Sequence, residues 1–252
     1  MKAWHIGNTT VRSPFRLRDA VKALSDSSLL GNLYGRDNEH AFSVLLLNNG
    51  VLQSPRLAEG KQADDLGRKW RSALTQLGFL VPRFTKILDV AVLIPGFSLR
   101  EGIITPSGRL LIEAESVPAI QEVFLRSLVA YQIPSVLETS YECKPFKPLI
   151  HVLTVMVELY EQAGSSSLSF PEIAYILQRS YPGDGVEHIV QEVLSFRETR
   201  LVDSNKKSFD KRYRERVVQL DKPEVAGNQT SIEQAANTLR DYADLNLRYL
   251  KA

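Results

Sequence analysis

The chain has 252 residues, of which 44% are hydrophobic and 24% are charged, the balance of an ordinary soluble globular protein. Its formal net charge of +2 excludes a uniformly basic coat for nucleic acid, so any anion site must come from local clustering. The single cysteine, Cys143, excludes an intrachain disulfide. No stretch has the apolar length of a signal peptide or a membrane span, so we expect a cytoplasmic protein that contacts no membrane.

The first half predicts three helices and then two strands. Apolar residues at helical spacing place a first helix over about 17–24, and a second helix is expected from an N-cap at Asp37 to the stop at Asn49-Gly50. A third is expected within residues 61–80, with Gly78 ending it. Its inward stripe comprises Leu66, Trp70, Leu74 and Leu77. Its opposite side presents Arg68, Arg71 and Thr75. Residues 79–84, "FLVPRF", predict a strand.

Residues 103–116 allow two interpretations. Pro106-Ser107-Gly108 is compatible with a hairpin turn between strands. Alternatively, Thr105 is an N-cap and Pro106 occupies the first helical position, which favours a short helix. We prefer the helix because two start rules are met at once. Ser116 then caps a longer helix, which Pro134 ends.

The second half is expected to follow a linker over 134–147. Its first helix, over 147–163, ends at Gly164, and Ser169 with Glu172 has the spacing of a capping box. The turn "YPGDG" leads into another helix, an arrangement that resembles a helix-turn-helix. Residues 202–229 are expected to form a polar loop. Thr230 and Glu233 are expected to cap a last helix that runs to the chain end.

This order of elements predicts a mainly α fold with small β wings (α+β), built from two winged-helix or helix-turn-helix-like subdomains. The first subdomain would span 1–135 and the second 145–252, with no wing behind its last helix. In a winged helix, the third helix can lie in the major groove while the strands contact the DNA backbone.

Catalytic chemistry finds little support in the sequence. The four histidines are scattered, with no second ligand at zinc-site spacing, and no phosphate-binding loop, dinucleotide fingerprint or nucleophile elbow is present. One carboxylate set deserves a test, because nucleases hold metal ions with an Asp and a Glu on adjacent strands. Asp89 with Glu113 and Glu115 could supply it. However, no lysine follows at the usual place, and a helix begun at Thr105 would take Glu113 off any strand.

The basic residues are better candidates for function. Arg12, Arg16 and Arg18 crowd the start of the first helix, where cations oppose the helix dipole, so an external partner is plausible. On the third helix, Arg68 and Arg71 lie one turn apart, with Lys69 beside them. Residues 196–216 hold eight Lys/Arg against four Asp/Glu, and a solvated face explains that run as well as binding does.

Several segments resemble the AlwI-type family of type IIS restriction endonucleases and their nicking relatives. The opening "WHIGNTTVRSPFRL", at 4–17, resembles the family's N-terminal signature at Trp4, Arg12, Pro14 and Arg16. The similarity continues in five later segments: "LGFL" at 77–80, "ITPSGRLL" at 104–111, "VFLRSLVAYQIPS" at 123–135, "KPLIHVL" at 147–153 and "QEVLSFR" at 191–197.

This resemblance implies a module that recognises a short site in double-stranded DNA. It implies that cleavage belongs to a separate Mg²⁺-dependent PD-(D/E)xK nuclease domain or subunit absent from this chain, which itself would need no cofactor. The expected DNA contacts are Arg12, Arg16, Arg68 and Arg71, then Arg18 and Lys69, with Thr75 also on the reading face; Trp70 is expected in the core. The alternative is a stand-alone winged-helix regulator or adaptor that binds DNA or a protein and never cleaves.

Overall fold

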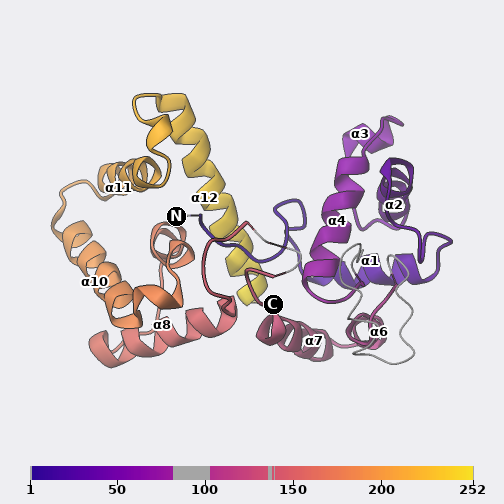
Figure 1. The fold of residues 1–252 in the computed structure, drawn as a ribbon, viewed down its shortest axis with the longest axis horizontal. Coiled ribbons are helices and arrows are strands. Elements are labelled where there is room, and N and C mark those ends of the chain that lie inside the picture. Colours follow the sequence, from indigo (N-terminus) through magenta and orange to yellow (C-terminus); the bar gives the residue numbers. More distant parts are fainter. Residues whose placement is uncertain (1, 82–102, 136–137, 139, 252) are drawn as a thin grey trace. The chain divides into compact units, whose positions relative to one another are not determined.

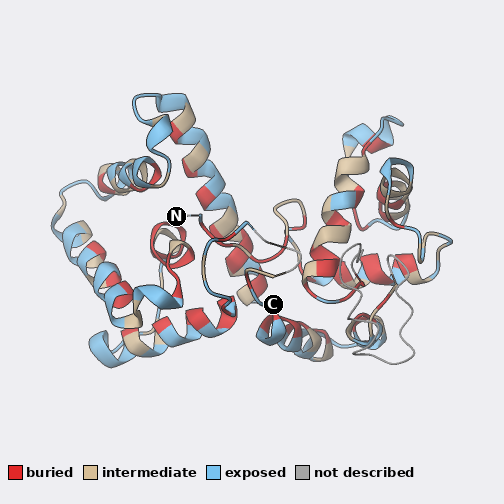
Figure 2. Ribbon diagram, viewed as in Figure 1, coloured by how far each residue is buried: buried red, intermediate tan, exposed pale blue. Residues whose placement is uncertain are grey.

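The structure, a computed structural model, describes residues 2–81, 103–135, 138 and 140–251 (Figure 1). The chain divides into two compact units. The N-terminal unit contains residues 7–131, and the C-terminal unit contains residues 132–250 together with the opening segment up to Ile6. Buried residues form a separate core in each unit and exposed residues cover the outer helix faces (Figure 2).

The most extensive helix packing of the N-terminal unit is between α2 (Arg36–Asn48) and α4 (Asp64–Gln76). They approach most closely at Gly67, where an added Cβ would lie 1.9 Å from the Glu39 carbonyl oxygen. No side chain larger than hydrogen fits there without moving a helix. The remaining helices of the unit are α1 (Phe15–Ser25), α3 (Pro55–Ala58), α6 (Pro106–Glu113) and α7 (Val117–Ala130).

The C-terminal unit is also built from helices. In chain order these are α8 (Pro148–Ala163), α9 (Phe170–Tyr175), η1 (Leu177–Arg179), η2 (Pro182–Asp184), α10 (Val186–Val202), α11 (Lys206–Asp221), η3 (Pro223–Val225) and α12 (Gln229–Leu250). Within this unit α9, α11 and α12 pack against one another, and α10 packs on α8.

The opening segment of the chain supplies part of the C-terminal core. Trp4 is fully buried, and its indole Nε1 donates a hydrogen bond of 3.0 Å to the Ser180 carbonyl. Its backbone N–H donates to the Gln178 carbonyl at 2.8 Å, and Asn246 Nδ2 donates to its carbonyl at 3.2 Å. Gln178 and Asn246 are themselves fully buried. A buried polar network, satisfied on every side, therefore ties residues 2–6 to elements more than 170 positions away.

The prediction of an α+β fold with wings was wrong. Of the described residues, 66% are helical and none belongs to a strand or sheet, so the described part of the fold is all-α. The predicted strand at 79–84 is described only to Val81, and there Leu80 makes a single antiparallel bridge to Ile104. Toward α6 the bridge ends at Ile104 because Thr105 begins the cap of that helix, and in the other direction it leads to residues outside the described ranges. The prediction that both subdomains are winged helices is therefore also wrong.

The helix-start signals were mostly confirmed. Thr105 accepts a hydrogen bond from the Gly108 N–H with Pro106 in the first turn, so 106–113 is a helix and not a hairpin. Ser116 caps α7, and Ser169 with Glu172 forms the expected capping box of α9. Gly164 ends α8 in the left-handed conformation that glycine adopts without strain.

Two local predictions failed in the segment 202–229. The polar loop is instead the helix α11, which Asn205 caps by accepting from the Ser208 N–H. Its missed signal is the apolar repeat Phe209, Tyr213 and Val217, whose ends are buried. The last helix begins at Gln229, because the side chain of Asn228 accepts from the Ser231 N–H and takes the capping role predicted for Thr230.

Candidate nucleic-acid interface

The arginines of the opening segment occupy three different environments at the start of α1. Arg12 is exposed, and its Nε donates a 3.3 Å hydrogen bond to the Thr9 carbonyl. Arg16, in the first turn of α1, is exposed, and its side chain makes no ion pair or hydrogen bond within the part of the chain that the structure describes. Arg18 is half-buried and donates to the Ile112 carbonyl of α6 at 3.3 Å. Arg16 is therefore the arginine of this group most open to a ligand.

Arg71 is held inside the N-terminal unit. Its Nη2 lies 2.6 Å from Glu39 Oε1, and both side chains are only 12% exposed. The guanidinium also lies over the Tyr34 ring, 3.7 Å from its centroid. Thr75, one turn further along α4, is buried and donates to the Arg71 carbonyl at 2.8 Å. Two of the residues expected to face DNA are thus held within the N-terminal unit.

Arg68 and Lys69 remain on the outer side of α4. Arg68 is exposed and pairs with no other residue among those described. Lys69 is half-buried, with Nζ 3.5 Å from Asp65 Oδ2, and Asp65 is also bound by Arg56. Burial opposes the charge of Asp65, but Arg56 and Lys69 outweigh it and hold its pKa below the ordinary value. Arg68 is therefore the cation of α4 most available to an external anion.

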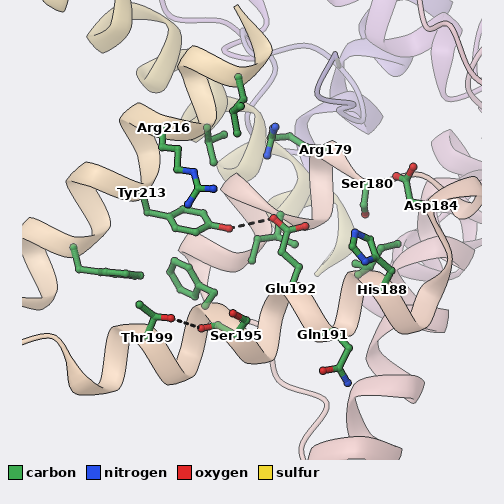
Figure 3. Close-up of a pocket in the computed structure, with 16 residues that line it drawn as sticks. Arg179, Ser180, Asp184, His188, Gln191, Glu192, Ser195, Thr199, Tyr213 and Arg216 are labelled. Carbon is green, nitrogen blue, oxygen red and sulfur yellow. Dashed lines mark hydrogen bonds between the residues drawn. The ribbon is translucent and has the colours of Figure 1, made fainter.

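A cavity of about 890 Å³ lies among η1, α10 and α11 of the C-terminal unit (Figure 3). Its polar side chains are largely paired with neighbours. Arg179 makes two hydrogen bonds to Asp221, of 2.6 and 2.7 Å, and the Tyr213 hydroxyl donates to Glu192 at 3.2 Å. Burial, and then the charge of Glu192, raise the pKa of Tyr213, so its hydroxyl stays protonated. These contacts join the helices around the cavity to one another.

A smaller, basic pocket lies among α9, α11 and α12. Four cations line it: Lys207, Lys211 and Arg214 from α11, and Arg240 from α12. The sequence showed the charge of 196–216 but not this convergence, because Arg240 lies outside that run and residues 202–229 were expected to form a loop. Only the packing of α11 on α12 brings them together.

The described carboxylates do not fit a Mg²⁺ site of the nuclease type. Glu113 is the last residue of α6 and is exposed, as is Glu115. Asp89, the expected partner of these two glutamates, lies outside the described residues. Within 2–81, 103–135, 138 and 140–251, no three His, Cys, Asp or Glu side chains gather closely enough to hold a metal ion.

The class to which the chain is related is that of the restriction endonucleases. A family model described as AlwI restriction endonuclease matches residues 75–252, which is more than half of the chain. The chain therefore belongs to the AlwI restriction endonuclease family, and this membership implies DNA as its partner. The match begins after the opening segment, so it does not test the signature at residues 4–17.

No curated protein matches the chain. Among the helices that the structure describes, none combines the length and apolar character needed to cross a membrane.

Proposed function

We propose that this chain recognises a specific site in double-stranded DNA, as part of a type IIS restriction or nicking endonuclease. Membership of the AlwI restriction endonuclease family carries the proposal. The exposed, unpaired guanidinium groups of Arg16 on α1 and Arg68 on α4 support it, because groups without an internal partner lose nothing when they bind phosphate or a base edge.

The proposed contacts differ in kind. Arg12 and Arg16 would bind the sugar-phosphate backbone, to which most protein–DNA hydrogen bonds are made. Arg68 projects from a regular helix and would read a guanine edge in the major groove, where arginine binds bidentately. Arg18 and Lys69, each partly engaged within the unit, would add weaker backbone contacts. Arg71 and Thr75 are left out because Arg71 is paired with Glu39 of α2 and Thr75 is buried.

Cleavage is proposed to reside in a Mg²⁺-dependent nuclease domain or subunit separate from this chain. The exposed position of Glu113 at the end of a helix supports this, because the pair considered in the sequence requires Glu113 on a strand. We expect the purified chain to leave plasmid DNA intact with Mg²⁺ present. Cutting that disappears in Asp89→Asn would contradict this part of the proposal.

Selection of bound sites from random duplex DNA tests the recognition itself. The expected result is an enriched short asymmetric sequence, bound more tightly than a scrambled duplex at the same salt concentration. Binding that shows no preference among sequences, or no binding at low salt, would contradict the proposed function.

A further inference from the structure

We propose that the basic pocket lined by Lys207, Lys211, Arg214 and Arg240 binds one backbone phosphate of duplex DNA. This inference rests on the proposed function and adds a contact in the C-terminal unit, whereas the contacts proposed above all lie in the N-terminal unit.

The charge in the pocket is strongly unbalanced. Lys207, Lys211 and Arg214 are spaced four and three residues apart on α11, so they share one helix face. Arg240 reaches the same pocket from α12. Asp210 is the one carboxylate in the lining, and Arg200 already neutralises it through two hydrogen bonds of 2.7 and 3.0 Å. The four cations are thus left without a matching negative charge in the lining.

These four cations have few partners in the described chain, and one of those partners is Tyr175, whose side chain is hydrogen-bonded to Arg214. Lys211 Nζ lies 3.9 Å from Glu215, at the outer limit of an ion pair. Lys207 and Arg240 are exposed and make no ion pair with any described residue. This contrasts with Arg197, Arg200 and Arg212 of the same basic run, each of which lies 2.6 to 2.8 Å from a carboxylate.

Arg214 gives the pocket a partly fixed donor. Its Nε is buried and has no hydrogen-bond partner among the described atoms, which is costly unless a ligand supplies one. Burial raises the pKa of Tyr175, while the charges of Arg214 and Arg240 act in the opposite direction. Both arginines line the same pocket as Tyr175. Two arginines, two lysines and a hydroxyl around one pocket provide the donors that phosphate oxygens accept.

A DNA phosphate fits this pocket better than a free nucleotide does. The cations are mostly exposed at the mouth, where they would meet a charge carried on a larger surface. The two aromatic side chains of the lining are Phe170 and Tyr175. Tyr175 is buried and Phe170 is half-buried, so neither stands clear of the surface as a platform for a base. A DNA phosphate and a free nucleotide both present phosphate oxygens, so binding must be measured with each kind of phosphate.

The test compares two double variants of the full chain that remove the same charge from the same two helices. Arg214→Gln with Arg240→Gln empties the pocket of guanidinium groups. Arg212→Gln with Arg248→Gln is the control, because those arginines pair with Asp203 and Asp244 at 2.6 and 2.8 Å and do not line the pocket. Duplex DNA affinity is measured over a range of salt concentrations, and thermal unfolding checks that each variant folds.

The pocket variant should flatten the slope of log affinity against log salt by about one unit, for selected and scrambled duplexes alike, since one phosphate adds about −0.9 to that slope. The control should leave the slope unchanged. A change of about two units would mean two separate phosphate contacts and would overturn the shared pocket. Equal slopes in the pocket variant and the wild type would overturn the proposal, even where wild-type recognition of a selected site upholds the proposed function.

Two further measurements cover an unfolded pocket variant and the binding of free phosphate. Lys207→Gln, at an exposed position, repeats the slope measurement if the pocket variant unfolds, and an unaltered slope there counts against the proposal. Calorimetry with inorganic phosphate, in the absence of DNA, tests the other source. Phosphate binding lost in the pocket variant, alongside an unchanged DNA slope, would assign the pocket to a free phosphate compound and overturn the DNA contact.

Discussion

The helices α4 and α11 both carry clustered cations, but the fold uses them differently. On α4, Arg71 is enclosed between Glu39 and Tyr34, and of its neighbours only Arg68 is left open. On α11, Lys207, Lys211 and Arg214 converge with Arg240 on one pocket, while Arg212 on the same helix is paired with Asp203. The comparison shows that a positive residue is available to DNA only where the tertiary structure has not already supplied its anion.

The largest expected effect is a loss of stability on removing Arg71, the enclosed cation of α4. Arg71→Gln leaves Glu39 charged, largely buried and without its partner, which costs about 3 kcal/mol of the free energy of unfolding. Denaturant unfolding measures the loss. The matched control is Arg68→Gln on the same helix, which should change stability by less than about 0.5 kcal/mol. Equal losses in the two variants would remove the distinction between them.

Lowering the pH should destabilise the C-terminal unit before the N-terminal unit, because of His151 in α8. Burial, opposed by Asp184 and the hydrogen bond to Ser180, lowers the pKa of this histidine to about 4. The unfolded chain binds the proton near pH 6.5 and the folded chain only near pH 4, so stability falls as pH decreases between these values, by up to about 3 kcal/mol. Thermal unfolding from pH 7 to pH 4 should show the C-terminal unit weakening first. The histidine's contribution should vanish in His151→Gln, and an unchanged pH profile in that variant would contradict the assignment.

The open arginine of α4 should affect binding and leave the fold intact. A bidentate pair with guanine discriminates by about 1–3 kcal/mol, so Arg68→Ala should relax the preference at one particular base pair of the selected site. A panel of duplexes with single base-pair substitutions measures this. If every duplex in the panel keeps its wild-type rank, α4 does not read the sequence.

The smallest effect is expected from Arg16→Ala. One lost backbone contact should weaken selected and scrambled duplexes to the same degree and flatten the salt slope by about one unit. Affinity measured at several salt concentrations for both duplexes provides the comparison. An unaltered slope would show that Arg16 is an ordinary solvated residue.

Local signals in the sequence determined many helix boundaries. Thr105-Pro106, Ser116 and the Ser169–Glu172 pair each mark a helix start, because the groups that satisfy the first free N–H donors lie within three residues of them. Gly164 marks a helix end for an equally local reason. The resemblance of several segments also pointed to the AlwI-type family, to which the chain belongs.

The predictions for α11 and for the wings were wrong, the first at a segment with a local helical signal and the second at one that depends on a distant partner. The many charges of α11 favoured a loop, although the apolar Phe209 and Val217, four residues on either side of Tyr213, and the cap at Asn205 indicate a helix. The predicted wings failed because the described residues hold only a single bridge there, between Leu80 and Ile104, and the chain from Thr105 onward forms a helix.

Tertiary structure alone decided which charges face outward. Arg68 and Arg71 are the same residue type three positions apart, yet the close approach of α2 at Gly67 encloses one and leaves the other in solvent. Likewise, Trp4 belongs to the C-terminal core only because Gln178, Ser180 and Asn246 surround it. Caps and helix periods depend on neighbours a few residues away, so the sequence contains them. Ion pairs and pockets depend on contacts between segments far apart in the chain, which exist only after the helices have packed.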